Sequence, residues 1–400
     1  MQRDVLPVIS KKKRGNKAIN LKEVSELRRR WRPEKSAVSR IYGCFVNSSK
    51  EIICNLDEPL GRMPQEEAEK YLALLKKVLS GTLGKNLIDI VFSTQQVMDG
   101  EEHRLLTAMR ASELKDGSIR QAFYQKVISS LDLGESKYLI LLACDAYDVP
   151  HRGKDDALQS DASETVFNYL LCAVCPIKEG RVELGYFPGD NEFHCAATQT
   201  VAAPELGFLF PAFDDRAANI YNALFYSRKP GELHQEFIDA VFHIDPPMSA
   251  AEQKETFQTA LSEALGDACS MDVIQAVHEQ LAAKIEEHKQ SKDPEPLTVS
   301  VDEISAILRD CGINDEQISA FGSLCSERFG EGAVLNPVNL IDAGRVEIKT
   351  AQASVSVDPE YSYLVETKLV DGKKYIMLPA EDGIEFNGFA VGLSVVDSEE

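Results

Sequence analysis

Apolar positions along the chain change from unbroken runs to helical spacing. Nearly continuous apolar runs occupy residues 138–144, 167–177 and 206–210. Unbroken runs are typical of strands covered on both faces, which implies helices packed on a sheet. Residues 219–226 form a further run, either a strand or a buried helix, because periodicity does not separate the two. The pattern predicts an α/β fold, α+β overall, built on a mixed sheet covered by helices.

Capping signals predict helices on both sides of these runs. Asn20 with Glu23 opens a short helix whose apolar stripe includes Trp31. Ser249 with Glu252 forms a capping box before another apolar helical stripe. After about residue 331, short alternating segments are typical of strands. From the N-terminus to the C-terminus, the chain is therefore predicted to form helices and strands together, then helices, and then mainly strands.

The chain is too long for one ordinary core. Single cores rarely grow past about 250–300 residues, and this chain has 400. The patterns predict a basic extension at residues 1–19, an α/β domain at 20–248, a helical segment at 249–330 and a small β-rich domain at 331–400.

The net charge of -21 is distributed unevenly. Residues 1–40 hold 13 lysines and arginines against 4 acids, which leaves 30 basic and 60 acidic residues for the remainder. Such an acidic body repels phosphates and anionic lipid. Any contact with a polyanion is therefore expected through the N-terminal arm.

The predicted first helix carries arginines beside the only tryptophan of the chain. These residues are the nucleic-acid-binding candidates: Arg28, Arg29, Arg30, Trp31 and Arg32. Arginines bind phosphates and tryptophan stacks on bases, which favours RNA or a ribonucleoprotein as partner. The alternative is that Trp31 is a core residue and the arginines pair with the acidic body.

Acidic and histidine residues gather near the ends of the apolar runs. The metal-binding candidates are Asp145, Asp148, His151, His194, Asp214 and Asp215. Ligands of open α/β sheets bind beyond the carboxyl ends of strands, and such side chains suit a divalent metal in phosphoester hydrolysis. The alternative is turn chemistry, with Asp214 and Asp215 capping a segment or pairing with Arg216. A divalent metal is the one cofactor class that the residues suggest.

Nine cysteines are scattered among the predicted elements rather than set at framework spacings. That distribution, without a signal-peptide pattern, predicts reduced thiols and a cytoplasmic protein. No apolar run reaches about 18 residues, so no membrane span is expected. Cys172 and Cys175 lie three apart on a predicted strand and should point to opposite faces, which excludes a shared metal.

Several segments together resemble a known family. They include ELRRR at 26–30, DAYDVP at 145–150, NEFH at 191–194 and GFLFPAFDDR at 207–216. With them, the chain resembles an uncharacterised bacterial family known only as a domain of unknown function, family 4317, over about residues 21–391. The resemblance implies a cytoplasmic bacterial protein and brings no activity, substrate or catalytic residue.

Three functions are compatible with the sequence. The leading hypothesis is a non-catalytic binding protein that contacts RNA or a ribonucleoprotein through its basic arm. The second is a metal-dependent phosphoester hydrolase that uses the aspartate and histidine cluster. The third is a protein-interaction scaffold in which the arm folds back on the acidic body, and arginines buried against carboxylates would favour it.

Overall fold

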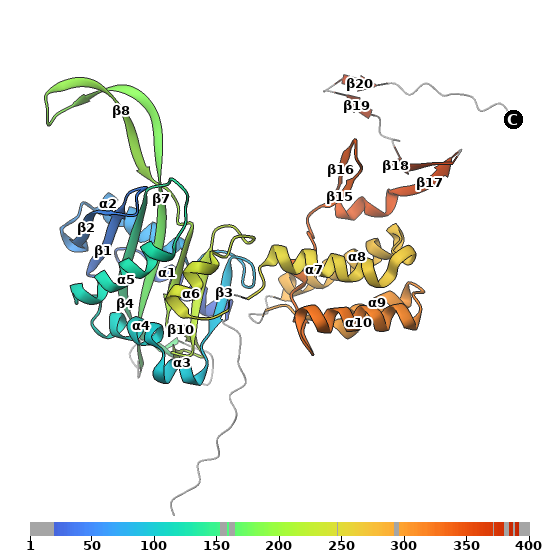
Figure 1. The fold of residues 1–400 in the computed structure, drawn as a ribbon, viewed down its shortest axis with the longest axis horizontal. Coiled ribbons are helices and arrows are strands. Elements are labelled where there is room, and N and C mark those ends of the chain that lie inside the picture. The colour runs from blue at the N-terminus through green and yellow to red at the C-terminus, as the bar shows by residue number, and fades with distance from the viewer. Residues whose placement is uncertain are drawn as a thin grey trace, which may run out of the picture. The chain divides into compact units, whose positions relative to one another are not determined.

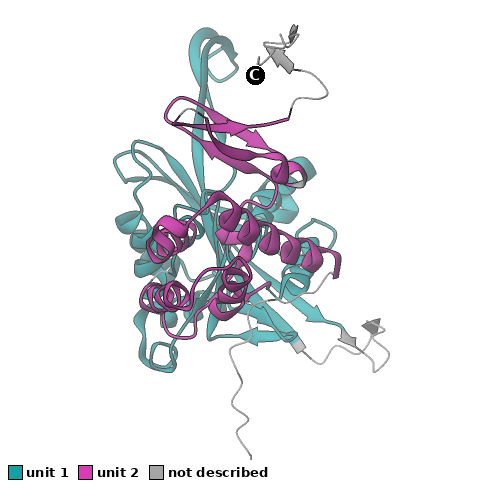
Figure 2. Ribbon diagram, turned by 90° about the vertical axis from the view of Figure 1, so that its right-hand side faces the viewer, with its two compact units in different colours: residues 1–253, 293–296 teal, residues 254–292, 297–400 magenta. Residues whose placement is uncertain are grey.

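The computed structural model describes residues 20–152, 158–159, 165–245, 247–291, 296–370, 372–379, 384–386 and 389–391. The chain forms two compact units, residues 1–253 with 293–296 and residues 254–292 with 297–400 (Figure 2). The basic extension expected at residues 1–19 lies outside the described residues. The four-part division of the chain stays a prediction.

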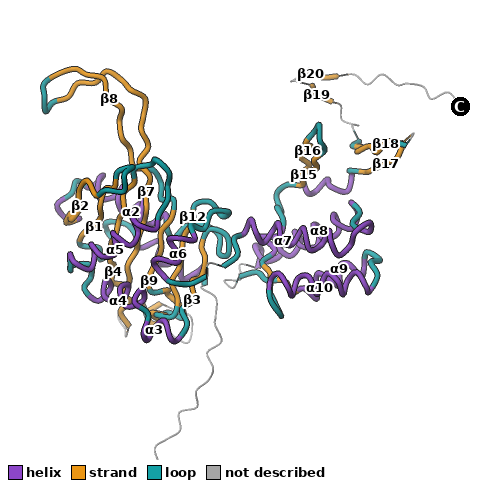
Figure 3. The backbone as a smooth tube through the Cα atoms, in the orientation of Figure 1, coloured by secondary structure: helices purple, strands orange, loops and turns teal. Residues whose placement is uncertain are grey.

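The first unit is built on an eight-stranded sheet (Figures 1 and 3). Its strands are β1 (Arg40–Val46), β2 (Ile52–Pro59), β3 (Leu87–Val91), β4 (Tyr138–Val149), β7 (Thr165–Phe187), β8 (Glu192–Val201), β9 (Leu206–Phe210) and β12 (Asn222–Ser227). The order is β2-β1-β4-β7-β9-β12-β3, with β8 paired to β7. Each of these neighbouring pairs is antiparallel, whereas the sequence predicts a mixed sheet, because unbroken apolar runs indicate cover on both faces and not strand direction. The run at 219–226, left open between strand and helix, contains most of β12.

Helices cover both faces of this sheet, as predicted. They are α1 (Leu21–Arg30), α2 (Gln65–Lys77), α3 (Thr94–Asp99), α4 (Glu101–Ala111), α5 (Gly117–Ser130) and α6 (Gln235–Phe242). Neighbouring residues of β4 enter different cores: Leu141 packs in the cluster that holds Leu72 of α2, and Leu142 in the cluster that holds Phe123 of α5. Side chains alternate across a strand, so one continuous apolar run supplies both cores. The α+β class is confirmed.

Two short hairpin pairs lie beside the main sheet. They are β5 (His151–Arg152) with β6 (Leu158–Gln159), and β10 (Ala212–Asp214) with β11 (Ala217–Asn219). Because β10 follows β9 directly, it carries Asp214 and Asp215 out of the sheet into a tight turn. Two of the predicted metal ligands, Asp214 and Asp215, therefore lie at this turn.

The second unit has a helical core of its own. Its helices are α7 (Ala250–Leu265), within which the unit boundary falls between Gln253 and Lys254, η2 (Gly266–Ala268), α8 (Met271–Ser291), α9 (Val301–Asp310), α10 (Asp315–Phe329) and α11 (Pro337–Leu340), with the short strands β13 (Val299–Ser300) and β14 (Val334–Leu335). The predicted capping box is present, since Ser249 N–H donates to Glu252 at 2.8 Å and Glu252 N–H donates to Ser249 Oγ at 3.1 Å. Phe257 and Phe321 lie in the core between the helices. None of the described helices combines the length and apolar composition needed to cross a bilayer.

The C-terminal region consists of separate two-stranded hairpins. Its elements are β15 (Val346–Lys349), β16 (Ser354–Val357), η3 (Pro359–Leu364), β17 (Glu366–Val370), β18 (Lys373–Met377), β19 (Ile384–Phe386) and β20 (Phe389–Val391). Val370 pairs with Lys373, which leaves a two-residue connection between β17 and β18. This is the hairpin that the Asp-Gly pair in the sequence predicts.

Candidate functional site

The buried face of α1 places Trp31 inside the first unit. Val24, Leu27 and Trp31 recur at helical spacing and pack in the core shared with α2. Trp31 is 2% exposed, and its indole N–H donates to the Tyr169 hydroxyl at 3.0 Å. The only tryptophan is therefore a core residue with a satisfied donor and presents no face for base stacking.

Asp145 is the centre of the polar contacts beneath α1. Its carboxylate accepts hydrogen bonds from the Tyr169 hydroxyl and from the Ala37 backbone N–H, each at 2.7 Å. Arg30 Nε lies 3.6 Å from Asp145 Oδ2, a distance for an ion pair rather than a hydrogen bond. Burial, followed by the neighbouring Asp145, raises the pKa of Tyr169 well above its ordinary value. The buried carboxylate is thus satisfied by three groups of its own chain.

A second set of contacts joins α1 to the β10–β11 turn. The Arg30 guanidinium lies 4.1 Å from the centre of the Tyr147 ring. The Tyr147 hydroxyl donates to Glu26, and Arg216 donates to both oxygens of Glu26 at 3.1 and 3.2 Å. Burial and the Glu26 contact raise the pKa of Tyr147 to about 12. Two-point pairing of this kind fixes the orientation of the guanidinium.

The turn that α1 holds has an unfavourable backbone. Asp214 pairs with Ala217, so Asp215 and Arg216 alone connect β10 to β11, with φ angles of 49° and 59°. Left-handed angles are uncommon for residues other than glycine, although two-residue hairpins require them. Glu23 Oε1 accepts the Arg216 backbone N–H at 2.9 Å. Helix α1 therefore stabilises this turn through both Glu23 and Glu26.

A series of side-chain hydrogen bonds between amides and carboxylates continues from the β10–β11 turn to β3 at the edge of the sheet. Asn219 Nδ2 donates to Asp214 at 3.2 Å and to Asn222 Oδ1 at 3.0 Å, and Asn222 Nδ2 donates to Asp89 at 2.7 Å. Burial, with a smaller contribution from Asp214, raises the pKa of Asp89 to about 6 against the lowering effect of the Asn222 bond. Burial also raises the pKa of Glu23. The ionised forms of these buried acids are destabilised by their surroundings.

The four predicted aspartate ligands lie in three places. Asp145 belongs to the polar contacts between α1 and the body, which we call the α1 network (Glu23, Glu26, Arg30, Asp145, Tyr147, Tyr169 and Arg216). Asp214 and Asp215 are at the β10–β11 turn, and Asp148 is exposed on β4. Asp145 and the β10–β11 turn are connected by side chains of the protein itself, namely Arg30, Tyr147, Glu26 and Arg216. The structure therefore gives Asp145 and Asp214 separate hydrogen-bond partners.

His194 lies far along β7 from Asp145. Asp145 pairs with Tyr169, whereas His194 pairs with Gly185, sixteen residues further on β7. At roughly 3.3 Å per residue, the two positions are about 50 Å apart along the strand. The imidazole of His194 stacks on Phe187 with ring centres 3.7 Å apart. The side chain of His151 lies outside the described residues.

The predicted nucleic-acid residues lie in the last turn of α1 and directly after it, and they divide into buried and outward-facing side chains. Arg30 and Trp31 face inward, whereas Arg28 is half-buried and Arg29 and Arg32 are exposed. Arg29 Nε donates to the Ser25 carbonyl at 3.2 Å. Arg28, Arg29 and Arg32 make no ion pair with any residue that the structure describes. Three of the five candidates keep an available positive charge.

Another group of side chains is spaced as the ligands of a metal ion would be. Among the described residues, Glu205, Glu232 and His234 bring their ligand atoms within 4.8 Å of one another. Lys229 Nζ lies 3.8 Å from Glu205 and 3.0 Å from Glu232, and Arg228 lies 3.5 Å from Glu205. These cations already neutralise the two carboxylates, so the group is a poor centre for a divalent ion.

Cys172 and Cys175 face opposite sides of the sheet, as predicted. Cys172 packs in the core that holds α5, and Cys175 packs in the core that holds α2. Burial raises the pKa of Cys175 to about 12 and that of Cys172 well above its ordinary value. A shared metal is excluded at these positions, and both thiols stay protonated.

A β ribbon extends beyond the sheet, and the sequence reasoning did not identify it. The outer half of β7 from Ile177 to Phe187 pairs with β8 (Figures 1 and 3). In the described chain, β8 pairs with β7 alone. The signal was the alternation of apolar and other residues at 182–186, which is typical of a strand with one apolar face.

All side chains of one ribbon face are uncharged in its outer half. This apolar face consists of Val182, Leu184, Tyr186, Phe193, Cys195 and Ala197, which form three cross-strand pairs. Its large side chains are exposed: Phe193 by 72%, Leu184 and Val182 by 69% and Tyr186 by 50%. The Tyr186 and Phe193 rings contact each other at 5.3 Å. A contiguous apolar surface of this kind is typical of a protein interaction site.

An irregularity in β7 keeps this face continuous. Glu179 pairs with Gln199 and Val182 pairs with Ala197, so β7 has one more residue than β8 between these pairs. Without that bulge, Val182 and the alternate residues after it would point to the opposite face from Ile177. The bulge thus places the apolar residues of both strands together.

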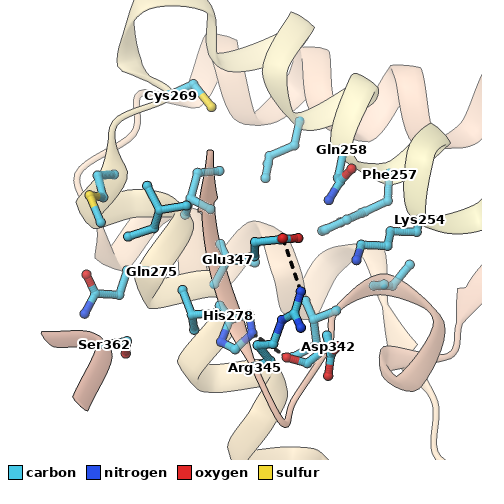
Figure 4. Close-up of a pocket in the computed structure, with 18 of the residues that line it drawn as sticks. Lys254, Phe257, Gln258, Cys269, Gln275, His278, Asp342, Arg345, Glu347 and Ser362 are labelled. Atoms are coloured by element: carbon cyan, nitrogen blue, oxygen red, sulfur yellow. Dashed lines mark hydrogen bonds and ion pairs between the residues drawn. The ribbon is translucent and has the colours of Figure 1, made fainter. Parts of the chain in front are cut away.

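The second unit contains a cavity of about 750 Å³ beside α7, α8 and β15 (Figure 4). Its apolar lining includes Phe257, Leu261, Ile274, Val277 and Leu340. His278 Nε2 donates to the Asp342 carbonyl at 3.0 Å, while Arg345 and Lys349 both pair with Glu347 at 3.2 and 3.0 Å. The volume suits a small molecule. Because these charges largely neutralise one another, the lining does not specify a ligand class.

Comparison with known proteins identifies the family. The model of the family described as "Domain of unknown function (DUF4317)" matches residues 19–389. The chain belongs to this family. The match confirms the resemblance that the sequence segments indicate and assigns no activity. No curated protein matches the chain.

Proposed function

We propose that this member of the family is a scaffold that acts by binding another protein, with the β7–β8 ribbon as its binding element. The exposed apolar face of the ribbon carries the proposal. An isolated two-stranded hairpin is marginally stable in water, and three or more strands or a packing partner are needed for independent stability. A face with Phe193, Leu184 and Val182 in water therefore favours a partner that covers it.

The α1 network supports the same proposal. Arg30 lies against Asp145, and Arg216 lies against Glu26. These ion pairs hold α1 against the sheet and the β10–β11 turn. This arrangement favours a scaffold over a first helix that is free to bind a polyanion.

Contact with RNA or a ribonucleoprotein is the second candidate. It is favoured by one observation: three arginines in and just after the last turn of α1 pair with no described carboxylate. They are Arg28, Arg29 and Arg32. A metal-dependent phosphoester hydrolase is less favoured, because Asp145 is satisfied by Ala37, Tyr169 and Arg30.

Site-specific photo-crosslinking tests the proposal. Benzoylphenylalanine replaces either Tyr186, on the apolar face, or its neighbour Phe187, on the opposite face, in cells that produce the full chain. We expect ultraviolet light to give covalent protein adducts from position 186 and few from position 187. The proposal fails if position 186 gives no adduct, or if both positions give the same adducts in the same yield.

A further inference from the structure

The chemistry of the apolar face suggests what covers it. Its three cross-strand pairs, Val182 with Ala197, Leu184 with Cys195 and Tyr186 with Phe193, contain no charged group. Non-obligate interfaces are about as apolar as the rest of a protein surface, whereas obligate homodimer interfaces are more apolar. A face without charge therefore resembles the interface of a homodimer more than that of a complex between unlike proteins.

We infer that the occupant is a second copy of this chain, which stacks its own ribbon on this face in a two-fold symmetric dimer. The inference rests on the proposed function and names its partner. Closed two-fold dimers are the commonest homo-oligomers, and their interface is one surface patch paired with itself. An uncharged patch meets no like charge when it is paired with itself.

Charge and side-chain size favour an antiparallel stack. The unit that carries the ribbon holds 38 acidic and 32 basic residues, so ribbons that point in opposite directions keep two units of like net charge apart. In that arrangement Leu184 and Cys195 lie at the two-fold axis. Tyr186 and Phe193 of one copy then cover Val182 and Ala197 of the other. Large side chains on small ones give the interdigitation that close packing requires.

The area that two such faces would bury corresponds to a small interface. A buried aromatic side chain removes about 150–250 Å² from water, so the half to three-quarters exposed side chains of two faces remove on the order of 1,000 Å². That is near the lower limit for a specific interface. The opposite ribbon face, with Glu183 and His194, stays in water.

Sedimentation velocity of the full chain tests the dimer. We expect wild type to sediment as a species of twice the 44.3 kDa chain mass, and L184K/F193K to sediment as a monomer. The matched control is E183K/H194K, which introduces the same two lysines on the same strands but on the opposite face, and it should remain a dimer. Fluorescence of the buried Trp31 verifies that each variant is folded. A monomeric wild type, a dimeric L184K/F193K or a monomeric control overturns the inference.

Cross-linking through Cys195 tests the antiparallel stack. Packed sheets lie about 10 Å apart, so a bis-maleimide of about that length should join the two Cys195 thiols. The variant C54S removes the exposed cysteine of β2 and should still give a covalent dimer, whereas C54S/C195S should not. Equal dimer yields from the two variants overturn the inference. Photo-adducts at position 186 with a different protein, from a chain that sediments as a monomer, would overturn the dimer and leave the scaffold proposal in place.

Discussion

The α1 network and the β7–β8 ribbon differ in which side chains face water. Around α1, polar groups that could face water, such as Arg30 and Glu26, are bonded to their own chain. On the ribbon, apolar groups such as Phe193 and Leu184 face water. Buried polar groups are tolerated when they are paired, while a large exposed apolar surface usually has a partner. The comparison indicates that α1 stabilises the fold and that the ribbon serves an interaction.

Replacing Trp31 should have the largest effect on stability. W31A removes a fully buried aromatic side chain and leaves the Tyr169 hydroxyl without its donor, so we expect a loss of about 3–5 kcal/mol in the free energy of unfolding. Urea denaturation followed by far-UV circular dichroism measures this loss, since W31A has no tryptophan to report it.

The matched variant W31F keeps an aromatic ring and removes mainly the indole hydrogen bond. We expect it to lose roughly 1–2 kcal/mol, the value of one buried hydrogen bond with some packing. If W31A were as stable as wild type, α1 would not be anchored in the fold, and the contrast between the two regions would disappear.

Replacing Asp89 should raise the free energy of unfolding above about pH 6, by less than W31A lowers it. Burial raises its pKa from 3.8 to about 6, so the folded protein binds a proton that the unfolded chain has already released between these values. Stability therefore falls as pH rises through this window and stays reduced above it. We expect D89N to be more stable than wild type by about 2–3 kcal/mol at pH 8, with the difference vanishing near pH 3.5.

Thermal or urea unfolding of D89N and wild type across this pH range measures the difference. The control is D148N, which changes an aspartate that is exposed on β4 and should alter stability little at either pH. A D89N variant that is less stable than wild type at pH 8 would show that the Asn222 bond outweighs the burial of the carboxylate.

Local patterns in the sequence predict much of the fold. The helices at α1 and α7 follow from their caps, Asn20 and Ser249, and the two-sided cover of the sheet follows from the unbroken run in β4. These features depend on residues close together in the chain. Periodicity and capping report such local preferences directly.

The pairing of distant residues could not be predicted in the same way. Glu26 and Arg216 are 190 positions apart, and no pattern near either residue specifies the other. Arg30 was expected to bind phosphate because its local sequence is basic, but the sheet places Asp145 beside it. The ribbon is not evident from the sequence because the charged and glycine residues at 178–181 separate the alternation at 182–186 from the buried apolar run, which suggests that the strand ends where the sheet does.

The exposed face of α1 offers the smallest expected effect on stability and the sharpest test of what its arginines do. R28E/R29E/R32E changes residues that pair with no described carboxylate, so we expect the free energy of unfolding to fall by only about 1 kcal/mol, mainly because Arg28 and Arg29 lie in the last turn of α1, where cations are favoured. If these arginines contact RNA, retention of single-stranded RNA on a filter at low salt should fall in this variant. The salt dependence should also become shallower, by about 0.7 in logarithmic slope for each lost phosphate contact.

The matched control is R30E, which places a carboxylate beside Asp145 on the buried face of the same helix. We expect R30E to lose stability, because two buried carboxylates repel each other where an ion pair stood. An outer-face triple variant that unfolds as readily as R30E would contradict the division of α1 into a structural and an available face. A triple variant that keeps full RNA retention would remove the arginines from any role in polyanion contact and leave the ribbon as the remaining binding element.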